Sequence, residues 1–344
     1  MNTITTQPAD ILSAPLDLIE AHIEIVGSTN PRINAMSEDA RLSIQETLKK
    51  RYSSVGISIV NNFEDLQALV AKKPELVILG MKLVLLDPSL SYDDSPKVWL
   101  SDYLHEHGIA FTGSDTAALT LEFDKQVAKQ SVIDAGLKSS RYFVSTLAAP
   151  IYDHTLSYPL FVKPTNRGDS KGVDGRSLVH SQQELEAKIR SIHTELSSDA
   201  LIEEYLPGRE FSVAVIKQRD SEALIALPIE ITIPANDQGD KFLSEEIKQA
   251  DTEQVIAVTD RELEEKLNAL AIGVFMALGS RDYGRIDMRI DALGEPSFIE
   301  ANLMPGLSDH GYLSRCFMLN GEISYESMIE QITTLGITRT HVRI

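Results

Sequence analysis

The stretch GRIDMRIDALGEPSFIEANLMPG, residues 284–306, decides the fold of this chain, because it holds two alternating runs on either side of a short turn. Successive side chains of a β-strand point to opposite faces of the sheet. In the first run, the polar side chains of Arg285, Asp287 and Arg289 therefore share one face. The opposite face carries the apolar side chains of Ile286, Met288 and Ile290.

The second run alternates in the same way, and it predicts a partner strand. Its faces would hold Phe298, Glu300 and Asn302 on one side and Ile299 and Ala301 on the other. If ALGE, residues 292–295, is a four-residue hairpin loop, Asp287 lies opposite Glu300 and Arg285 lies opposite Asn302.

This pairing predicts a cation site. Two carboxylates directly opposite one another repel unless a cation lies between them. The oxygens of Asp287, Glu300 and Asn302 suit a hard divalent ion, so Mg²⁺ is the natural candidate, with Mn²⁺ as an alternative. Mg²⁺ favours one or two carboxylates together with substrate phosphates, which indicates a nucleotide site. A half-buried hairpin with a solvated polar face explains the alternation alone equally well.

The turn that follows adds a second chemical function. NLMPG ends the polar strand with a Pro-Gly turn, residues 302–306. The amide of Gly306, beside the guanidinium of Arg285, could stabilise a developing oxyanion.

Composition restricts the class of protein. The 344 residues suggest two or three domains, and the net charge of -19 disfavours nucleic acid and anionic membranes as partners. A single cysteine, Cys316, excludes an internal disulfide, and no apolar run reaches the roughly 18 residues that span a bilayer. We expect a soluble, cytoplasmic protein without a targeting segment.

Four segments are expected along the chain. They are an N-terminal arm (1–20), an N-terminal α/β domain (21–113), a central subdomain (114–215) and a C-terminal subdomain (216–344). In the second segment, strand-like and helix-like runs alternate, which predicts a parallel sheet with helices on its faces. No GxGxxG motif follows these strands, so a dinucleotide site has no support. The run over residues 115–136 predicts one helix.

A glycine-containing segment, TNRGDSKGVDGRS at 165–177, separates two strand-like runs of the central segment. Glycine allows backbone amides to approach an anion closely, so this hairpin loop could hold phosphate groups. The alternative is a plain surface turn.

Five pieces of the chain together resemble the ATP-grasp ligases, and most of all the D-alanine–D-alanine ligases, from about residue 109 to 332. The pieces are TGSDTAALTLEFDK, YPLFVKPTNRGDSKGV, EEYLPGREFSVAV, DKFLSEE and the opening stretch. The resemblance implies an N-terminal parallel α/β domain followed by two α+β subdomains that sandwich ATP.

The resemblance also implies roles for single residues. Lys125 and Lys163 would contact the phosphates of ATP, and Lys163 would also lie near the adenine. Lys241 would reach the γ-phosphate from a mobile lid. The loop over the phosphates would consist of Gly168, Asp169, Ser170, Lys171, Gly172 and Val173. The adenine would bind at Glu203, Glu204, Tyr205 and Leu206, and the ribose hydroxyls at Glu210.

The catalytic and metal residues of the family fall on the opening stretch. Asp287, Glu300 and Asn302 would hold magnesium, usually two ions, and Arg285 with the Gly306 amide would be the oxyanion donors. Such enzymes form a C–N bond through an acyl phosphate, with a small-molecule amino acid and a carboxylate-type acceptor as substrates. Homodimers are common in the family, although no segment of this sequence indicates one.

Three departures from the family concern substrate contacts. An HGxxGEDG-type segment is replaced by ILGMKLVLLDPSLSYDDSPK, and the first βα loop, GSTNPRINAMSED, lacks the expected glutamate and serine pattern. Gly311 stands where the family has a serine for the second alanine. The amine site would be bordered by Asp309, His310, Gly311 and Tyr312.

The departures favour a ligase that couples an amino acid to an acceptor other than D-alanine. Three alternatives stay open: a ligase that attaches an amino acid to a mycosporine (cyclohexenone) core, an ordinary D-Ala-D-Ala or other dipeptide ligase, and a catalytically silent ATP-binding regulator.

Overall fold

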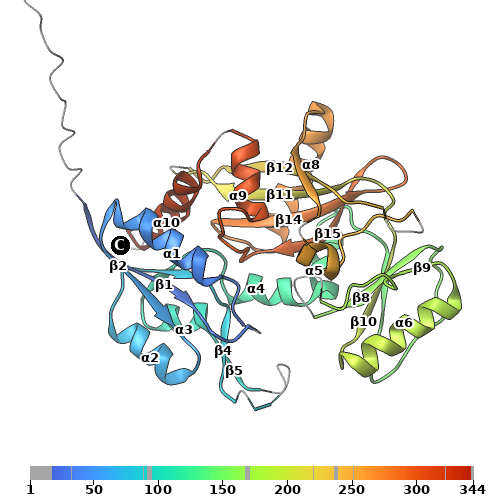
Figure 1. Ribbon diagram of the computed structural model, residues 1–344, viewed down its shortest axis with the longest axis horizontal. Coiled ribbons are helices and arrows are strands. Elements are labelled where there is room, and N and C mark those ends of the chain that lie inside the picture. The colour runs from blue at the N-terminus through green and yellow to red at the C-terminus, as the bar shows by residue number, and fades with distance from the viewer. Residues whose placement is uncertain are drawn as a thin grey trace, which may run out of the picture.

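The structure is a computed structural model that describes residues 18–31, 33–87, 89–90, 95–166, 171–219, 221–235, 239–250, 252–321 and 323–341. Its N-terminal unit is a parallel four-stranded sheet in the order β2-β1-β3-β6 (Figure 1). The strands are β1 (Ile19–Gly27), β2 (Tyr52–Ile59), β3 (Leu76–Leu79) and β6 (Ala110–Phe111). The predicted parallel sheet is therefore confirmed, and β1 begins inside the segment that we expected to be an arm.

Helices and a small hairpin complete this unit. They are α1 (Glu38–Lys49), α2 (Phe63–Ala71), α3 (Leu100–Glu106) and the antiparallel pair β4 (Leu83–Leu85) and β5 (Lys97–Trp99). The side chains of Ser37 and Asn62 accept hydrogen bonds from the first-turn amides of α1 and α2, which explains where both helices begin.

The single helix expected over 115–136 is wrong, because the structure has two helices there. They are α4 (Thr116–Phe123) and α5 (Lys125–Asp134). Asp124 has an extended conformation between them, and its carboxylate accepts hydrogen bonds from the amides of Gln126 and Val127. Lys125 is consequently the first residue of α5.

The central unit is an antiparallel sheet in the order β7-β10-β8-β9, covered by α6 (Gln182–Glu195). Its strands are β7 (Tyr142–Ser145), β8 (Leu160–Pro164), β9 (Leu178–Val179) and β10 (Ala200–Glu204). β8 and β9 pair antiparallel, so segment 165–177 joins two paired strands as predicted.

The third unit is a five-stranded antiparallel sheet in the order β13-β12-β11-β14-β15. Its strands are β11 (Glu210–Lys217), β12 (Leu224–Thr232), β13 (Gln254–Ala257), β14 (Tyr283–Ile290) and β15 (Pro296–Asn302). Its helices are α7 (Glu245–Ala250), α8 (Arg261–Ala277), α9 (Tyr312–Leu319) and α10 (Tyr325–His341). Because β11 pairs with β12 and β14, we propose that the central unit ends before Glu210, and not at residue 215.

The β14–β15 hairpin confirms the predicted pairing of Asp287 with Glu300 and of Arg285 with Asn302. Its loop is longer than predicted, because Ile290 pairs with Pro296 and residues 291–295 form the turn. The register shifts between Asp287 and Met288, so β15 contains one extra residue, a β-bulge.

The bulge corrects the predicted faces of β15. Phe298 pairs with Met288 and is completely buried in the main hydrophobic core. Ile299 and Glu300, although adjacent in sequence, both border the same cavity. The prediction that Phe298 shares the face of Glu300, with Ile299 opposite, is therefore wrong, because alternation fails at a bulge.

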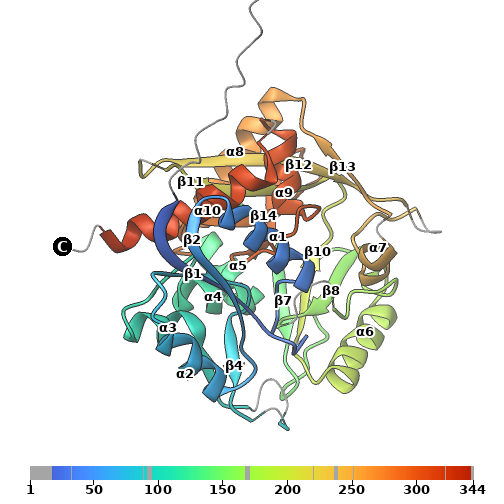
Figure 2. The same cartoon turned by 60° about the vertical axis from the view of Figure 1, so that its left-hand side comes forward.

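The last helix returns to the N-terminal unit. α10 packs against α1, β3 and β6 of the N-terminal unit, and Figure 2 shows it leading to the C-terminus on that side of the molecule. Arg339 of α10 forms an ion pair of 3.1 Å with Asp282, whose carboxylate also accepts the amide of Gly113 at 2.8 Å. α10 therefore packs on the N-terminal sheet and covers part of it.

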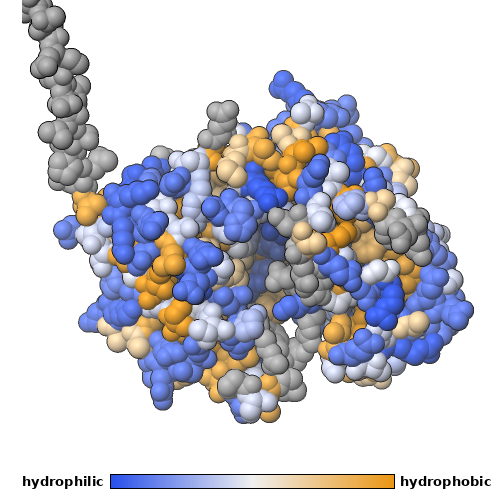
Figure 3. Space-filling model, in the orientation of Figure 1, coloured by the Kyte–Doolittle hydropathy of each residue, from blue (hydrophilic) through white to orange (hydrophobic). Residues whose placement is uncertain are grey.

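The face seen in Figure 3 is largely hydrophilic, with apolar side chains in separate patches. Among the helices of the described ranges, none is long and apolar enough to cross a membrane.

Candidate active site

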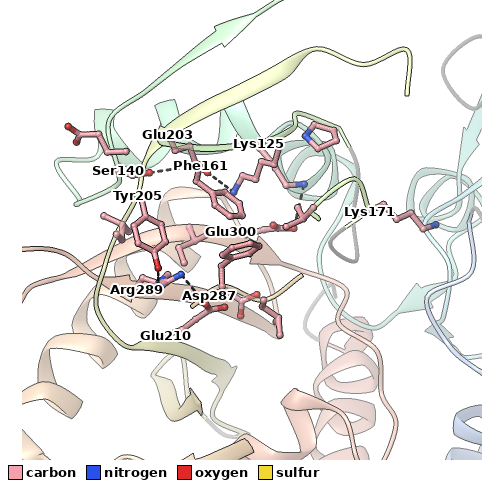
Figure 4. A pocket seen from close by; sticks show the side chains of 18 residues that line it. Lys125, Ser140, Phe161, Lys171, Glu203, Tyr205, Glu210, Asp287, Arg289 and Glu300 are labelled. Atoms are coloured by element: carbon pink, nitrogen blue, oxygen red, sulfur yellow. Dashed lines mark hydrogen bonds and ion pairs between the residues drawn. The ribbon is translucent and has the colours of Figure 1, made fainter. Parts of the chain in front are cut away.

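A cavity lies between the central sheet and the β14–β15 hairpin, and Figure 4 shows its side chains converging from both sides. The predicted site residues that line it are Lys125, Lys163, Lys171, Val173, Glu203, Glu204, Tyr205, Leu206, Glu210, Asp287 and Glu300. Residues that the sequence reasoning did not select are Ser140, Phe161, Pro164, Phe242, Leu243, Arg289 and Ile299. The fold thus brings most of the predicted nucleotide and metal residues to one place.

Buried lysines and glutamates form the polar part of the cavity wall. Nζ of Lys163 lies 2.7 Å from Oε2 of Glu203, and Nζ of Lys125 lies 3.5 Å from Oε1 of Glu300. The side chains of Lys125, Lys163 and Glu203 are about 5% exposed. Each of these charges therefore depends on its partner.

The pKa shifts follow from burial and from these partners. Burial alone would raise the pKa of Glu203, but the charges of Lys129 and Lys163 lower it to about 2. Burial lowers the pKa of Lys125, and the charge of Glu300 offsets only part of that shift. For Lys163, the carboxylates of Glu203 and Glu300 outweigh burial and raise the pKa.

Lys129 is a functional candidate that the sequence reasoning missed. Its side chain is completely buried, and Nζ lies 2.5 Å from Oε1 of Glu203. The only signal in the sequence is its place on α5 one helical turn after Lys125, since residues i and i+4 share a helix face.

Arg285, predicted as an oxyanion donor, is bound in this structure to Asp287, which is predicted as a metal ligand. Its Nε and Nη2 each lie 3.0 Å from one carboxylate oxygen of Asp287. The same carboxylate accepts hydrogen bonds from Oγ of Ser212 at 2.5 Å and from Nδ2 of Asn302 at 2.9 Å. Burial would lower the pKa of Arg285, but the Asp287 charge raises it, so the guanidinium stays charged.

The residues present fit a magnesium site that is completed by substrate. Asp287 and Glu300 face each other across the hairpin, and both line the cavity. Within the residues that the structure describes, no three or more His, Cys, Asp and Glu side chains cluster as a metal cage. Two carboxylates and an amide suit Mg²⁺ when phosphates supply further oxygens.

Arg289 contacts Tyr205, predicted at the adenine, and Glu210, predicted at the ribose. Its guanidinium lies 4.9 Å from the ring of Tyr205, and Nη1 lies 3.6 Å from Oε2 of Glu210. The hydroxyl of Tyr205 donates to the carbonyl oxygen of Lys241 at 2.8 Å. Lys241 is therefore attached to Tyr205 of the cavity wall, but it does not itself line the cavity, and its side chain is exposed.

The residue after Lys241 closes one side of the cavity. Phe242 is buried against Val173 and Leu178, and its ring lies 5.4 Å from that of Phe161. Lid and phosphate-loop residues thus share a small apolar cluster. Gly172, also predicted in that loop, has φ +80 and offers its carbonyl to Lys188 at 3.0 Å. Gly168, Asp169 and Ser170 lie outside the described residues.

Of the predicted amine-site residues, Tyr312 contacts the guanidinium of Arg285. Its ring lies 5.3 Å from Cζ of Arg285, and its hydroxyl donates to Oε1 of Glu253 at 2.5 Å. Burial and the Glu253 carboxylate raise the pKa of Tyr312, so the phenol remains protonated. Glu253 is another residue that the sequence reasoning missed.

The remaining predicted residues lie on the loop that leads into α9. Asp309 and His310 are exposed, and Nδ1 of His310 lies 2.7 Å from Oδ1 of Asp309. Gly311 is the N-cap residue of α9. A Cβ atom added to Gly306 would lie 3.3 Å from the carbonyl oxygen of Ala35. The predicted oxyanion turn is therefore next to the first βα loop.

Comparisons with known proteins agree with this geometry. A family model described as "D-ala D-ala ligase C-terminus" matches residues 138–334. The chain is 31% identical over 236 residues to the uncharacterized protein y4sG of Sinorhizobium fredii, covering 67% of this chain and 68% of that protein. It is 30% identical over 234 residues to the D-alanine–D-alanine ligase of Marinomonas sp., a match that covers 67% of this chain and 70% of that protein.

A solved structure extends the likeness to the fold. The D-alanine–D-alanine ligase of Bacillus anthracis complexed with ATP matches with a TM-score of 0.69 at 20% identity, over 94% of this chain and 100% of that one. Taken with the matched C-terminal family model, this likeness identifies the fold as ATP-grasp. The chain belongs to the ATP-grasp ligases of the D-alanine–D-alanine ligase type.

Proposed function

We propose that the protein is an ATP-dependent carboxylate–amine ligase that couples an amino acid to an acceptor other than D-alanine and releases ADP and phosphate. One observation carries the proposal. Lys125 and Lys163 face Asp287 and Glu300 around a single cavity, with Arg285 bound to Asp287 at its edge. Cations for the phosphates, oxygen ligands for a metal ion and an oxyanion donor are thereby combined in one site.

In the first step, a carboxylate oxygen of the acceptor attacks the γ-phosphorus of ATP. The bond to the β,γ-bridging oxygen breaks, and ADP and an acyl phosphate result. Lys125, Lys163 and Lys241 would reduce the repulsion between the anionic reactants and hold them in line. Bound magnesium, held by Asp287, Glu300 and Asn302, would neutralise phosphate charge.

In the second step, the amine attacks the acyl carbon and forms a tetrahedral intermediate. The N–H groups of Arg285 and Gly306 would stabilise its oxyanion before phosphate leaves. A guanidinium carries five N–H donors, and Nε and Nη2 of Arg285 are directed at Asp287. The pair with Asp287 would thus fix the plane of Arg285 while other N–H groups remain for the intermediate.

The substrate part of the proposal rests on the loops beside this oxyanion turn. The first βα loop, which departs from the family pattern, meets Gly306 at Ala35. Gly311, in place of the family's serine, caps α9 next to Tyr312. Different side chains therefore surround the acceptor and the amine. Part of the third departing segment, residues 88 and 91–94, lies outside the described residues.

A mycosporine core is one acceptor that fits this chemistry. Its cyclohexenone oxygen belongs to a vinylogous carboxylate, which the same phosphorylation could activate. D-alanine is the second candidate, because relatives in Marinomonas and Bacillus anthracis are D-alanine–D-alanine ligases. A catalytically silent regulator is disfavoured, because Glu300 lines the cavity and Arg285 is bound to Asp287, another residue of the cavity wall.

Phosphate release with ATP and magnesium tests the proposal. L- and D-amino acids would be supplied alone and paired with carboxylate or enone acceptors, including a mycosporine core. We expect release that needs one acceptor and one amine together and disappears in Glu300→Ala. Strong release with D-alanine alone would contradict the substrate proposal. Release with no pair would favour the regulator.

A further inference from the structure

Two lysines approach the carboxylate of Glu203 from opposite sides, and only one of them lines the cavity. Oε2 accepts from Lys163 at 2.7 Å, and Lys163 belongs to the cavity wall. Oε1 accepts from Lys129 at 2.5 Å and from Oγ of Ser140 at 2.9 Å, a contact drawn in Figure 4. Lys129 is completely buried, so it lies behind the wall.

The environment of Lys129 is built to hold a charged ammonium group. Besides Glu203, its Nζ lies 3.0 Å from Oγ of both Ser139 and Ser140, and 3.3 Å from the carbonyl oxygen of Phe298. It also lies 5.6 Å from the ring centroid of Phe298. A buried ammonium is tolerated only with such partners. Lys129 thus connects α5, β10 and β15 at one point.

The ion pairs around the cavity show how Lys129 affects its net charge. Asp287 is paired with Arg285, and Glu210 with Arg289. Glu204 is paired with Arg141. Three buried ammonium groups, those of Lys125, Lys129 and Lys163, then face the two carboxylates of Glu203 and Glu300. Among these five groups, one positive charge is left over, and the exposed Lys171 is a further cation at the cavity. Without Lys129, Glu203 would neutralise Lys163, and no excess positive charge would remain among the buried groups.

We propose that Lys129 is a positioning residue that neutralises Glu203 from behind the cavity wall and so leaves the charge of Lys163 available to the phosphates of the nucleotide. This inference rests on the proposed nucleotide-binding role of the cavity. It assigns Lys129 no contact with substrate, and it makes ATP affinity, not the chemical step, the quantity that Lys129 controls.

Charge counting provides the test. Lys129→Met removes the leftover charge, whereas Lys129→Arg keeps it. We expect Lys129→Met to bind ATP at least about tenfold more weakly by calorimetry. Its kcat at saturating ATP should change much less. Lys129→Arg, which keeps a cation beside Glu203, should stay within a few-fold of the wild-type affinity.

A matched control separates charge from stability. Lys72 pairs with the buried carboxylate of Glu24 at 3.0 Å in the N-terminal sheet, away from the cavity. Lys72→Met should lower the Tm and leave ATP affinity unchanged. If Lys129→Met fails to fold, Lys129→Gln decides the matter, since it also removes the charge but keeps a hydrogen-bond donor for Glu203.

Two results would overturn the inference: wild-type ATP affinity in a folded Lys129→Met or Lys129→Gln, or weak ATP binding by a Lys129→Arg variant with the wild-type Tm. Inorganic tripolyphosphate serves as a second probe, because it carries the phosphates without the base, and it should follow the same order. Failure of the wild-type protein to bind ATP would instead refute the proposed function, so the two failures are distinguishable.

Discussion

Arg285 lies between Asp287, a predicted metal ligand, and Tyr312 of the predicted amine site. It binds both carboxylate oxygens of Asp287, and its guanidinium lies over the ring of Tyr312. Arg285→Ala should leave ATP affinity nearly unchanged, since Arg285 is not among the residues that line the nucleotide cavity. Ligation should fall by a factor on the order of a hundred to a thousand, as for the loss of one oxyanion donor. Calorimetry with ATP and a coupled ligation assay measure the two effects. An equal loss of both would contradict the oxyanion role.

Glu203 should make the stability of the protein sensitive to acid. Its folded-state pKa of about 2 lies below its ordinary value of 4.5, so the stabilisation is complete above pH 4.5 and is lost as the pH falls towards 2. Glu203→Gln has no carboxylate at this position and therefore lacks this stabilisation. In urea unfolding from pH 5 to pH 2, the free energy of unfolding of the wild-type protein should fall more steeply than that of Glu203→Gln and approach it. Parallel curves would mean that Glu203 is not held ionised by its lysines.

The sequence predicted the residues of the hairpin site better than the residues behind it. The pairing of Asp287 with Glu300 follows from strand periodicity and turn position, and both are local properties. The sequence alone does not distinguish Lys129 from an ordinary exposed polar residue of a helix. Only the packing of α5 against β10 and β15 buries it, and that information lies far away along the chain.

At the scale of elements, the bulge in β15 determines which of its side chains line the cavity. It puts Ile299 and Glu300 side by side on the cavity and leaves Phe298 in the core. Ile299→Ala should weaken ATP binding by about 1 kcal/mol, roughly fivefold in Kd, through lost apolar contact. The Tm should change little. Nucleotide titration and thermal unfolding measure these effects.

The neighbouring residue is the control for that experiment. Phe298→Ala empties a buried core position and should cost about 3–5 kcal/mol in the free energy of unfolding. If Ile299→Ala were as destabilising as Phe298→Ala, Ile299 would be a core residue and the role of the bulge would be refuted.

Element types were largely predictable, whereas their interruptions were not. The alternating strands and helices of the N-terminal unit and the β14–β15 hairpin follow from apolar periodicity. A periodic pattern does not reveal an inserted residue such as Ile299. The break before α5 had a usable signal, because an aspartate such as Asp124 is a favoured N-cap residue.

At the scale of the whole molecule, α10 ties the last unit to the first. Arg51 and Glu330 form an ion pair of 2.8 Å, and a Cβ atom added to Gly336 would lie 2.6 Å from a methyl carbon of Leu76. Removing residues 325–341 should expose the apolar side of the N-terminal sheet. We expect a much lower Tm and aggregation, measured by thermal unfolding and light scattering. A shortened chain with the wild-type Tm would show that the first unit does not need α10.

The return of α10 also has a consequence for the order in which the chain folds. The first sheet is complete by residue 111, yet the helix that covers part of it begins more than two hundred residues later, at Tyr325. During synthesis, the N-terminal unit must therefore wait with apolar surface uncovered until α10 has left the ribosome. Such long-range closure slows folding, because the intervening loop must be ordered before the contact forms. The first part of the protein to be made is thus among the last to be finished.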